Sequence, residues 1–359
     1  MDFGTSKMNG FREQLMYWHK HTNVRQMPWK GEKDPYKIWL SEIILQQTRV
    51  DQGWKYYLDF TRSFPTVANL ANANDDLVFK KWEGLGYYSR CINLLATARK
   101  IRDDYNGHFP ADYDALLLLR GIGPYTAAAI ASFAFGLPRA VVDGNVVRIL
   151  SRFFGIDDAF DQPAGRKLFQ KLAQQILFLP DPAAYNQAIM DFGATVCKPM
   201  APLCSQCVLG SNCFAYKQDR VGLLPIKSKK LVKKDRYFTF IILMYQQQFW
   251  VIRRSGKDIW NHLYTFLLNE EADFVDFTNT TGVKLLKKEK WKGRIMAPDR
   301  MLPRQALTHQ WINTRMVQVQ LNQKPANLPA EGLWVHKELL HTLAFPRTLK
   351  HFIAQNIPK

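Results

Sequence analysis

Four of the five cysteines in this chain lie within seventeen residues, at positions Cys197, Cys204, Cys207 and Cys213. So tight a thiol cluster in a long chain is not typical of disulfide frameworks, which belong to small secreted domains. It predicts a metal site, for which zinc and an iron–sulfur cluster are the two candidates. The spacing C-x6-C-x2-C-x5-C contains a single short pair between wider gaps. Such spacing favours iron–sulfur ligation over zinc, which prefers two short pairs.

The composition limits the possible classes of protein. A chain of 359 residues is long enough for two domains, and 47% hydrophobic and 13% aromatic residues exclude a disordered protein. Lys and Arg outnumber Asp and Glu by 49 to 31, which favours a nucleic-acid partner. The first ten residues lack the apolar core of a signal peptide, and the apolar stretch 127–137 is about half a membrane span. We therefore expect an intracellular protein without a membrane partner.

The pattern of apolar residues changes after Cys213. Before it, helical spacing and caps such as Asp34-Pro35 predict an all-α region. The helices expected there include 111–119, 124–135, 145–154, 165–179 and 183–196. After it, a lysine-rich segment with Pro and Gly predicts a linker. Strands are then expected at 237–245, 249–253 and 315–321, with a terminal helix at 347–353, which indicates an α+β domain.

Three features of the helical region point to chemistry. Gly121 and Gly123 bracket an isoleucine between two predicted helices, and a turn of this kind offers backbone N–H groups to a phosphate without reading base sequence. Asp143 follows at the head of a predicted helix, where an N-cap is the alternative interpretation. Glu42 lies in an apolar helical segment. It would either form a salt bridge there or have the raised pKa that an acid catalyst requires.

Together these motifs resemble the endonuclease III superfamily of base-excision DNA glycosylases, and within it the adenine DNA glycosylases of the MutY type. The segment 39–48 (WLSEIILQQT) is similar to the adenine-specific branch. The resemblance covers nearly the whole chain and implies a [4Fe–4S] cluster on the four cysteines. It divides the chain into a helical glycosylase region at 1–221, a basic linker at 222–236 and a Nudix-like domain at 237–359. The glycosylase region includes a helix–hairpin–helix at 112–136 and the cluster loop at 197–213.

The resemblance also implies a mechanism. Adenine opposite 8-oxoguanine or guanine is flipped out of duplex DNA, and Glu42 protonates it at N7. Asp143 stays ionised and stabilises the oxocarbenium-like sugar, while Tyr125 and Asn145 hold Asp143 by hydrogen bonds. Bifunctional relatives carry a lysine two residues after the last hairpin glycine, where this chain has Tyr125. A monofunctional enzyme with water as nucleophile is therefore expected.

Further positions are assigned by the same resemblance. Residues near the adenine would be Arg25, Trp29, Lys30, Leu45 and Gln187. Contacts with DNA would come from Gln47, Thr48, Tyr87, Gly121, Gly123, Thr308 and His309. Gln47 and Tyr87 match residues that wedge into the base stack. Leu307 replaces the aromatic of the family's 8-oxoguanine-reading loop, and Lys30 stands where the family often has arginine. The chain has no Nudix box, so pyrophosphatase activity is not expected.

Two other functions remain open at this point. An endonuclease III-like enzyme that removes oxidised pyrimidines and nicks the strand is opposed by Tyr125 and Glu42. A non-catalytic DNA-binding iron–sulfur protein is opposed by the presence of both carboxylates. We expect a monomer, located with the bacterial nucleoid in the cytoplasm or, in a eukaryote, in the nucleus.

Overall fold

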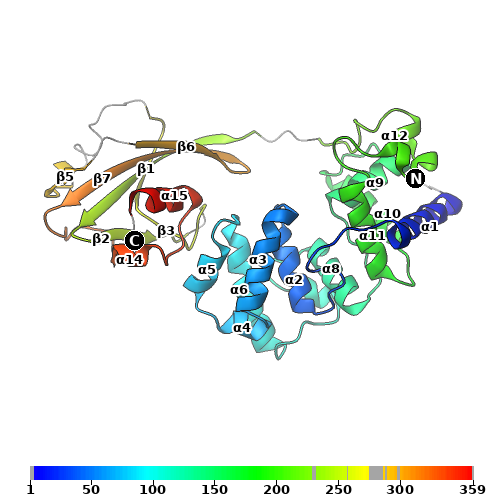
Figure 1. Cartoon of the computed structure of the whole chain (residues 1–359), viewed down its shortest axis with the longest axis horizontal. Helices are drawn as coiled ribbons and strands as arrows, with labels where there is room; N and C mark the ends of the chain where they lie inside the picture. The colour runs from blue at the N-terminus through cyan, green and yellow to red at the C-terminus, as the bar shows by residue number, and fades with distance from the viewer. Residues whose placement is uncertain are drawn as a thin grey trace. The chain divides into compact units, whose positions relative to one another are not determined.

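The computed structural model describes residues 4–228, 232–256, 258–274, 286–287, 289–296 and 300–357. The chain forms two compact units (Figure 1). Unit 1 comprises Met1–Asn72 and Asn93–Lys230, and unit 2 comprises Ala73–Ile92 and Leu231–Lys359. Within the described ranges, no helix is both long enough and apolar enough to cross a membrane.

Unit 1 is helical, as the sequence predicts. Its helices are α1 (Thr5–His21), α2 (Pro35–Leu45), α3 (Val50–Ser63), α4 (Val67–Asn72), most of α6 (Tyr88–Asp104), α7 (Tyr113–Leu117), α8 (Pro124–Phe135), α9 (Gly144–Phe154), α10 (Pro163–Gln175), α11 (Pro182–Thr195) and α12 (Phe214–Lys217). Short 3₁₀ turns lie at Cys204–Gln206 and Gly210–Asn212. The predicted helix 165–179 instead spans Pro163–Gln175, after which the chain leaves the helix and buries Ile176 and Leu177 in the core.

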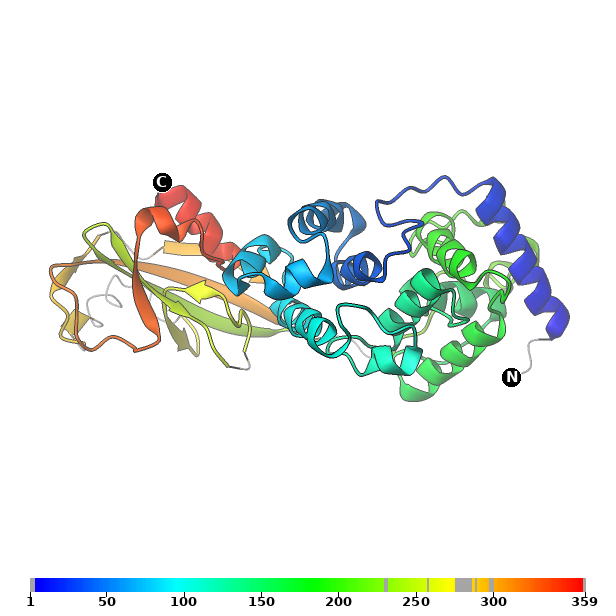
Figure 2. The same cartoon turned by 90° about the horizontal axis from the view of Figure 1, so that it is seen from below.

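Two packing arrangements position the chemistry of unit 1. A core of aromatic and aliphatic residues joins α1, α9, α10 and α11, and α1, the dark blue helix of Figure 2, contacts α11. Separately, α2 packs closely against α8. The buried face of α8 is almost entirely alanine, from Ala127 to Ala131 with Ile130, and such small side chains allow two helix backbones to approach. This packing brings Glu42 of α2 within hydrogen-bonding distance of Tyr125 in the first turn of α8.

Unit 2 contains a mixed sheet with the strands β1 (Lys234–Tyr245), β2 (Gln248–Arg253), β3 (Tyr264–Thr265), β4 (Leu267–Glu271), β5 (Gly293–Ile295), β6 (Arg300–Ala306), β7 (Gln310–Leu321) and β8 (Gly332–His336). The central path is β3-β2-β1-β7-β5, with β4 on β1, β6 on β7 and β8 on β2. Only the β1–β7 pair is parallel among the described pairings. Two helices, α14 (Lys337–Leu340) and α15 (Arg347–Asn356), follow the last strand.

Two domain boundaries in the structure differ from those predicted from the sequence. The predicted linker 222–236 ends too late, because Lys234, Asp235 and Arg236 already pair with β7 at the start of β1. Residues 229–231 of that linker lie outside the described residues. In addition, the segment Ala73–Ile92, with α5 (Asp75–Trp82), groups with unit 2 although it precedes the linker by well over a hundred residues. Tertiary contacts with the sheet domain, which a linear sequence does not reveal, account for this difference.

Candidate active site

Unit 1 contains a pocket of about 740 Å³ between α2, the first turns of α8 and α9, α11 and the loop before α2. Eleven residues predicted from the sequence line it together: Arg25, Trp29, Lys30, Glu42, Leu45, Gln47, Thr48, Tyr125, Asp143, Asn145 and Gln187. They come from segments far apart in the chain. The fold thus brings the four proposed catalytic residues and all five proposed adenine contacts to one cavity.

Glu42 lies on the face of α2 that packs against α8, and only 6% of it is exposed. Burial raises the pKa of Glu42 to about 7, and the nearby charge of Asp143 adds to the effect. A hydrogen bond from the Tyr125 hydroxyl opposes the shift. A carboxyl group with this pKa carries a proton in a large share of molecules at neutral pH, so it can donate that proton to a bound group.

Asp143 caps the N-terminus of α9, where its Oδ1 accepts from the backbone N–H of Val146 at 2.8 Å. Its Oδ2 accepts from Asn145 Nδ2 at 2.7 Å. The pKa of Asp143 is raised, mainly by burial, and these donors and the Arg148 charge offset part of the shift. The positive end of the helix dipole also favours the ionised form. The N-cap interpretation and the catalytic one are therefore compatible, since the cap itself supplies donors to the charged carboxylate.

The partner of Tyr125 differs from the sequence-based prediction. Tyr125 was expected to hold Asp143, whereas its hydroxyl hydrogen-bonds to Glu42 and interacts with Asp143 only through charge. The reason is the close packing of α2 on α8, which places Glu42 next to the first turn of α8. Asn145 does donate to Asp143 as expected.

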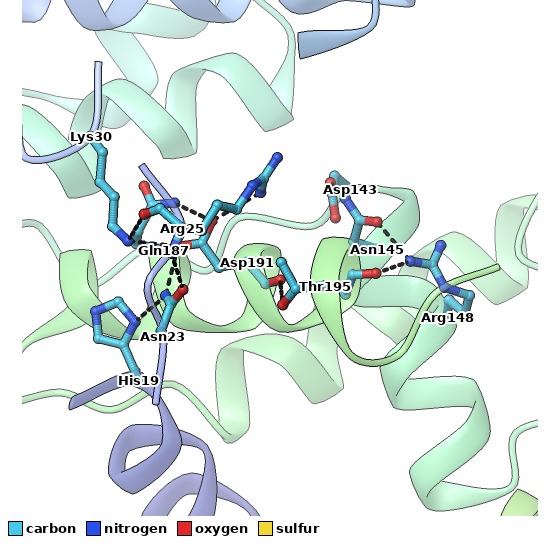
Figure 3. A network of polar contacts seen from close by, with 11 residues as sticks. His19, Asn23, Arg25, Lys30, Asp143, Asn145, Arg148, Gln187, Asp191 and Thr195 are labelled. Atoms are coloured by element: carbon cyan, nitrogen blue, oxygen red, sulfur yellow. Dashed lines mark hydrogen bonds and ion pairs between the residues drawn. The ribbon is translucent and has the colours of Figure 1, made fainter. Parts of the chain in front are cut away.

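A fully buried carboxylate, Asp191 on α11, organises the opposite side of the pocket (Figure 3). Its Oδ1 accepts from Arg25 Nη1 at 2.9 Å and from Gln187 Nε2 at 3.0 Å. Its Oδ2 accepts from Asn23 Nδ2 at 2.8 Å and pairs with Lys30 Nζ at 3.2 Å. Neither Asp191 nor Asn23 was predicted from the sequence as a site residue. A carboxylate between Met190 and Phe192 in a predicted helix was the available signal.

The remaining wall of the pocket combines aromatic packing with a strained turn. Trp29 is buried and packs edge-on against Tyr57, with ring centroids 5.3 Å apart, so it serves as core and as pocket lining. Gln47 follows the end of α2 with a φ of 54°, which non-glycine residues rarely adopt. Strain of this kind persists where a function requires it, which is consistent with a contact role for Gln47.

Helix α9 also reaches the cysteine loop. Arg148 donates to Asn145 Oδ1 at 2.7 Å and to the Cys197 carbonyl at 2.7 Å. One turn on, Arg152 donates to the Lys198 carbonyl at 2.8 Å and to Cys197 Sγ at 3.5 Å. Both arginines are largely buried. The N-terminus of α9 thus carries the pocket carboxylate Asp143, and Arg148 and Arg152 further along the helix hold the loop that bears the thiols.

The four clustered cysteines line a second, small cavity together with Arg152 and apolar side chains. Burial raises the pKa of the Cys204 and Cys213 thiols, and that of Cys207 to about 11. Within the described ranges, no three His, Cys, Asp or Glu side chains are grouped closely enough to hold a single metal ion. Cys91 lies apart and is buried, as expected for a core residue.

Comparison with known proteins identifies the family. Residues 40–175 match the HhH-GPD superfamily base excision DNA repair proteins. An adenine DNA glycosylase of Buchnera aphidicola from Schizaphis graminum is 32% identical over 281 residues, which cover 78% of this chain and 81% of the relative. The chain belongs to the adenine DNA glycosylase family. The human adenine DNA glycosylase is 40% identical over 59% of this chain and 40% of its own length. A thermostable thymine-DNA glycosylase structure covers 60% of this chain and 100% of its own at 29% identity, with a TM-score of 0.56.

Family membership makes this chain a base-excision repair glycosylase with a helix–hairpin–helix fold. The hairpin is the turn between α7 and α8. Gly121 has a φ of 78°, and a Cβ on it would come within 2.7 Å of Asn93 Cβ, so a larger residue is excluded there. Gly123 is the N-cap of α8, which leaves the first backbone N–H groups of that helix without intrahelical partners.

Three residues predicted for this glycosylase lie in unit 2. Tyr87 is 40% exposed and has a φ of 47°, in the loop between α5 and α6. Thr308 and His309 occupy the turn between β6 and β7, where His309 is exposed. The structure thus groups eleven of the predicted residues in one pocket and places the glycine hairpin, the cysteine loop, Tyr87 and the β6–β7 turn elsewhere.

Proposed function

We propose that this glycosylase is monofunctional and removes adenine paired with 8-oxoguanine or guanine in duplex DNA. The observation that carries the proposal is the pair of carboxyl groups in one pocket with different hydrogen-bond support. Glu42 is buried with a hydrogen bond from Tyr125, and its pKa is raised to about 7. Asp143 accepts hydrogen bonds at both carboxylate oxygens and lies at a helix N-terminus. Acid and charge-stabilising roles can be divided between two carboxyl groups in this way.

In the proposed mechanism, adenine flips out of the base stack into the pocket, because its glycosidic bond is inaccessible within the duplex. Glu42 donates its proton to N7, and the base becomes a better leaving group. Tyr125 orients the Glu42 carboxyl group through its hydroxyl. As the bond breaks, positive charge develops on the sugar, and the ionised Asp143 stabilises it from a position fixed by Val146 N–H and Asn145.

Water completes the proposed reaction. A lyase step would need an amine that attacks the sugar, and Tyr125 occupies the position at which the resemblance places that lysine. Lys30 also lines the pocket, but it is held by the Arg25 carbonyl at 2.6 Å and by Asp191. We therefore expect an intact strand with an abasic site as product.

We further propose that Cys197, Cys204, Cys207 and Cys213 hold a [4Fe–4S] cluster. Four soft sulfur donors around one cavity suit iron–sulfur chemistry, and neighbouring Arg148 and Arg152 would balance the negative charge of the thiolates. Bound there, the cluster would tie the loop 197–213 together by its four iron–thiolate bonds. Its contribution would be to the shape of the loop next to α9.

DNA contacts are proposed for both units. The N–H groups at Gly121 and Gly123 would bind a backbone phosphate, and Gln47, Thr48 and Tyr87 would contact the opened base stack. The sheet domain would be Nudix-like, and Thr308 and His309 on its β6–β7 turn would read 8-oxoguanine. An exposed hairpin turn that carries a hydroxyl and an imidazole supports such a role, because it presents hydrogen-bonding groups to a partner.

The test uses three labelled duplexes, carrying adenine opposite 8-oxoguanine, adenine opposite guanine, and an oxidised thymine opposite adenine. The purified chain should produce an alkali-sensitive site at adenine in the first two and leave the third intact. Strand cleavage before alkali treatment would contradict the monofunctional assignment. Removal of the oxidised thymine, with adenine untouched, would replace the proposed function by that of an endonuclease III-like enzyme.

A further inference from the structure

The buried Asp191 takes no part in the chemical steps proposed above, yet it contacts three residues that line the pocket. Its carboxylate is fully buried on α11 and accepts four contacts, from Arg25, Gln187, Asn23 and Lys30 (Figure 3). An ionised carboxylate offers about four acceptor positions. All of them are therefore used, and two of the four partners, Arg25 and Lys30, are cations.

This arrangement fixes the orientation of the Gln187 side-chain amide. A carboxylate can only accept hydrogen bonds, so the amide must turn its NH₂ group toward Asp191, which it does at 3.0 Å. The orientation follows from hydrogen-bond chemistry, which distinguishes the nitrogen of an amide from its oxygen. Gln187 Oε1 receives no donor from any described residue, and Gln187 lines the pocket. The pocket wall consequently presents an acceptor at this point.

An acceptor suits adenine and repels a base with oxygen at the same position. Adenine carries an amino donor at C6, whereas guanine carries the O6 acceptor there. We propose that Asp191 sets the base specificity of the pocket by holding the Gln187 amide with its oxygen toward the bound base. The inference rests on the proposed function, since it takes adenine as the base that enters. Asp191 is a positioning residue in this scheme, and it touches the base only through Gln187.

The Asp191→Asn variant tests the orientation directly. Asparagine has the same shape but carries an amide, so its NH₂ group can donate to Gln187 Oε1 and let the Gln187 NH₂ group face the base. We would measure single-turnover excision of adenine and of hypoxanthine, which has oxygen at C6, each placed opposite 8-oxoguanine. Loss of the charge next to Arg25 and Lys30 should slow both reactions. The ratio of the adenine rate to the hypoxanthine rate should fall at least about ten-fold, as expected for one misplaced hydrogen bond.

A double variant, Asp191→Asn with Gln187→Glu, provides the matched rescue. The introduced glutamate can only accept, so one of its oxygens takes the hydrogen bond from the introduced asparagine amide and the other faces the base. The pair also keeps one negative charge near Arg25 and Lys30. The adenine preference should return toward that of the wild type. A double variant whose ratio stays at the level of Asp191→Asn would overturn the orientation mechanism.

Gln187→Met covers the case in which Asp191→Asn does not fold. Methionine is similar in size and lacks the amide, and it leaves Asp191 with its three other partners. This variant should lose adenine preference by a similar factor while its melting temperature stays near that of the wild type. An unchanged ratio in Gln187→Met, or in a folded Asp191→Asn, overturns the inference. A wild-type chain that does not excise adenine at all contradicts the proposed function instead, so the two failures are distinguishable.

Discussion

Replacing Glu42 by glutamine should stabilise the protein at alkaline pH while it abolishes excision. The folded structure raises the pKa of Glu42 from its ordinary 4.5 to about 7, mainly by burial. Each pH unit of such a difference corresponds to about 1.4 kcal/mol, so holding Glu42 ionised in the folded state costs about 3 kcal/mol. Glutamine is neutral at every pH and can still accept the hydrogen bond from Tyr125.

The sign of the pH dependence follows from proton binding. Between about pH 4.5 and 7 the folded state keeps the Glu42 proton while the unfolded state loses it, so the free energy of unfolding falls as pH rises. The stabilisation that this proton provides is complete below the pKa of Glu42 in the unfolded chain. It is lost as the pH rises through the pKa of Glu42 in the folded protein. The Glu42→Gln variant lacks this loss. Its advantage over the wild type should therefore grow from pH 5 to pH 8.

The assay compares the melting temperatures of the two full-length proteins at pH 5 and pH 8. About 3 kcal/mol corresponds to roughly 6–12 °C for a unit of this size. Other titrating groups are common to both proteins, so the change in the difference isolates Glu42. The wild-type single-turnover rate should also fall as pH rises through about 7. A melting-temperature difference that is the same at both pH values would refute the raised pKa and the acid role together.

Three further outcomes are expected. Asp143→Asn should slow excision at least about a hundred-fold with DNA binding nearly intact, because asparagine keeps the cap on Val146 but loses the charge; wild-type excision rates would contradict the assignment. Protein purified anaerobically should be yellow-brown with about four iron atoms per chain, and stoichiometric zinc without iron would exclude the cluster. Alanine at both Thr308 and His309 should reduce the preference for 8-oxoguanine over guanine about ten-fold, and an unchanged ratio of single-turnover rates would assign lesion reading elsewhere.

The sequence predicted local structure where local signals are strong. Helix α8 has the predicted limits, because Pro124 begins it and Gly136, with a φ of 66°, ends it. Helix α9 begins within one residue of its prediction for the same kind of reason, since Asp143 caps it. The candidate site residues were taken from the resemblance, and eleven of them line one pocket in the structure. They converge because α2 packs on α8 and α11 packs on α9.

What the sequence could not show are contacts between distant segments. Asp191 is separated by 168 and 166 residues from Asn23 and Arg25, so nothing local indicates that they meet. The hydrogen bond of Tyr125 was assigned to Asp143 because the resemblance links those positions, and only the packing of α2 on α8 shows that Glu42 is its partner. The difference concerns the hydrogen-bond partner of Tyr125, while both candidate partners line the same pocket.

The segment 73–92 shows a second consequence of distant contacts. Glu83, at the end of α5, has a nearly buried side chain that accepts from the Phe345 backbone N–H at 3.0 Å and pairs with Lys350 and Lys80. Phe79 of the same helix stacks on His262, with ring centroids 5.4 Å apart. The loop that carries Tyr87 follows directly after Glu83. The sheet domain thus holds the base of the loop that we propose to enter the base stack.

A chain that ends at Leu224 should therefore keep its pocket but lose the order of this loop. Without Phe345 and Lys350 the buried Glu83 loses two partners, and a buried carboxylate that loses its partners destabilises its surroundings. Backbone amides of 73–92 should exchange hydrogen faster than in the full chain, while those of α8 should not change. Glu83→Gln in the full chain is the matched control and should give a smaller increase, confined to the same segment. Equal exchange in 73–92 with and without the sheet domain would show that these contacts do not order the loop, and removal of the domain would then affect lesion reading alone.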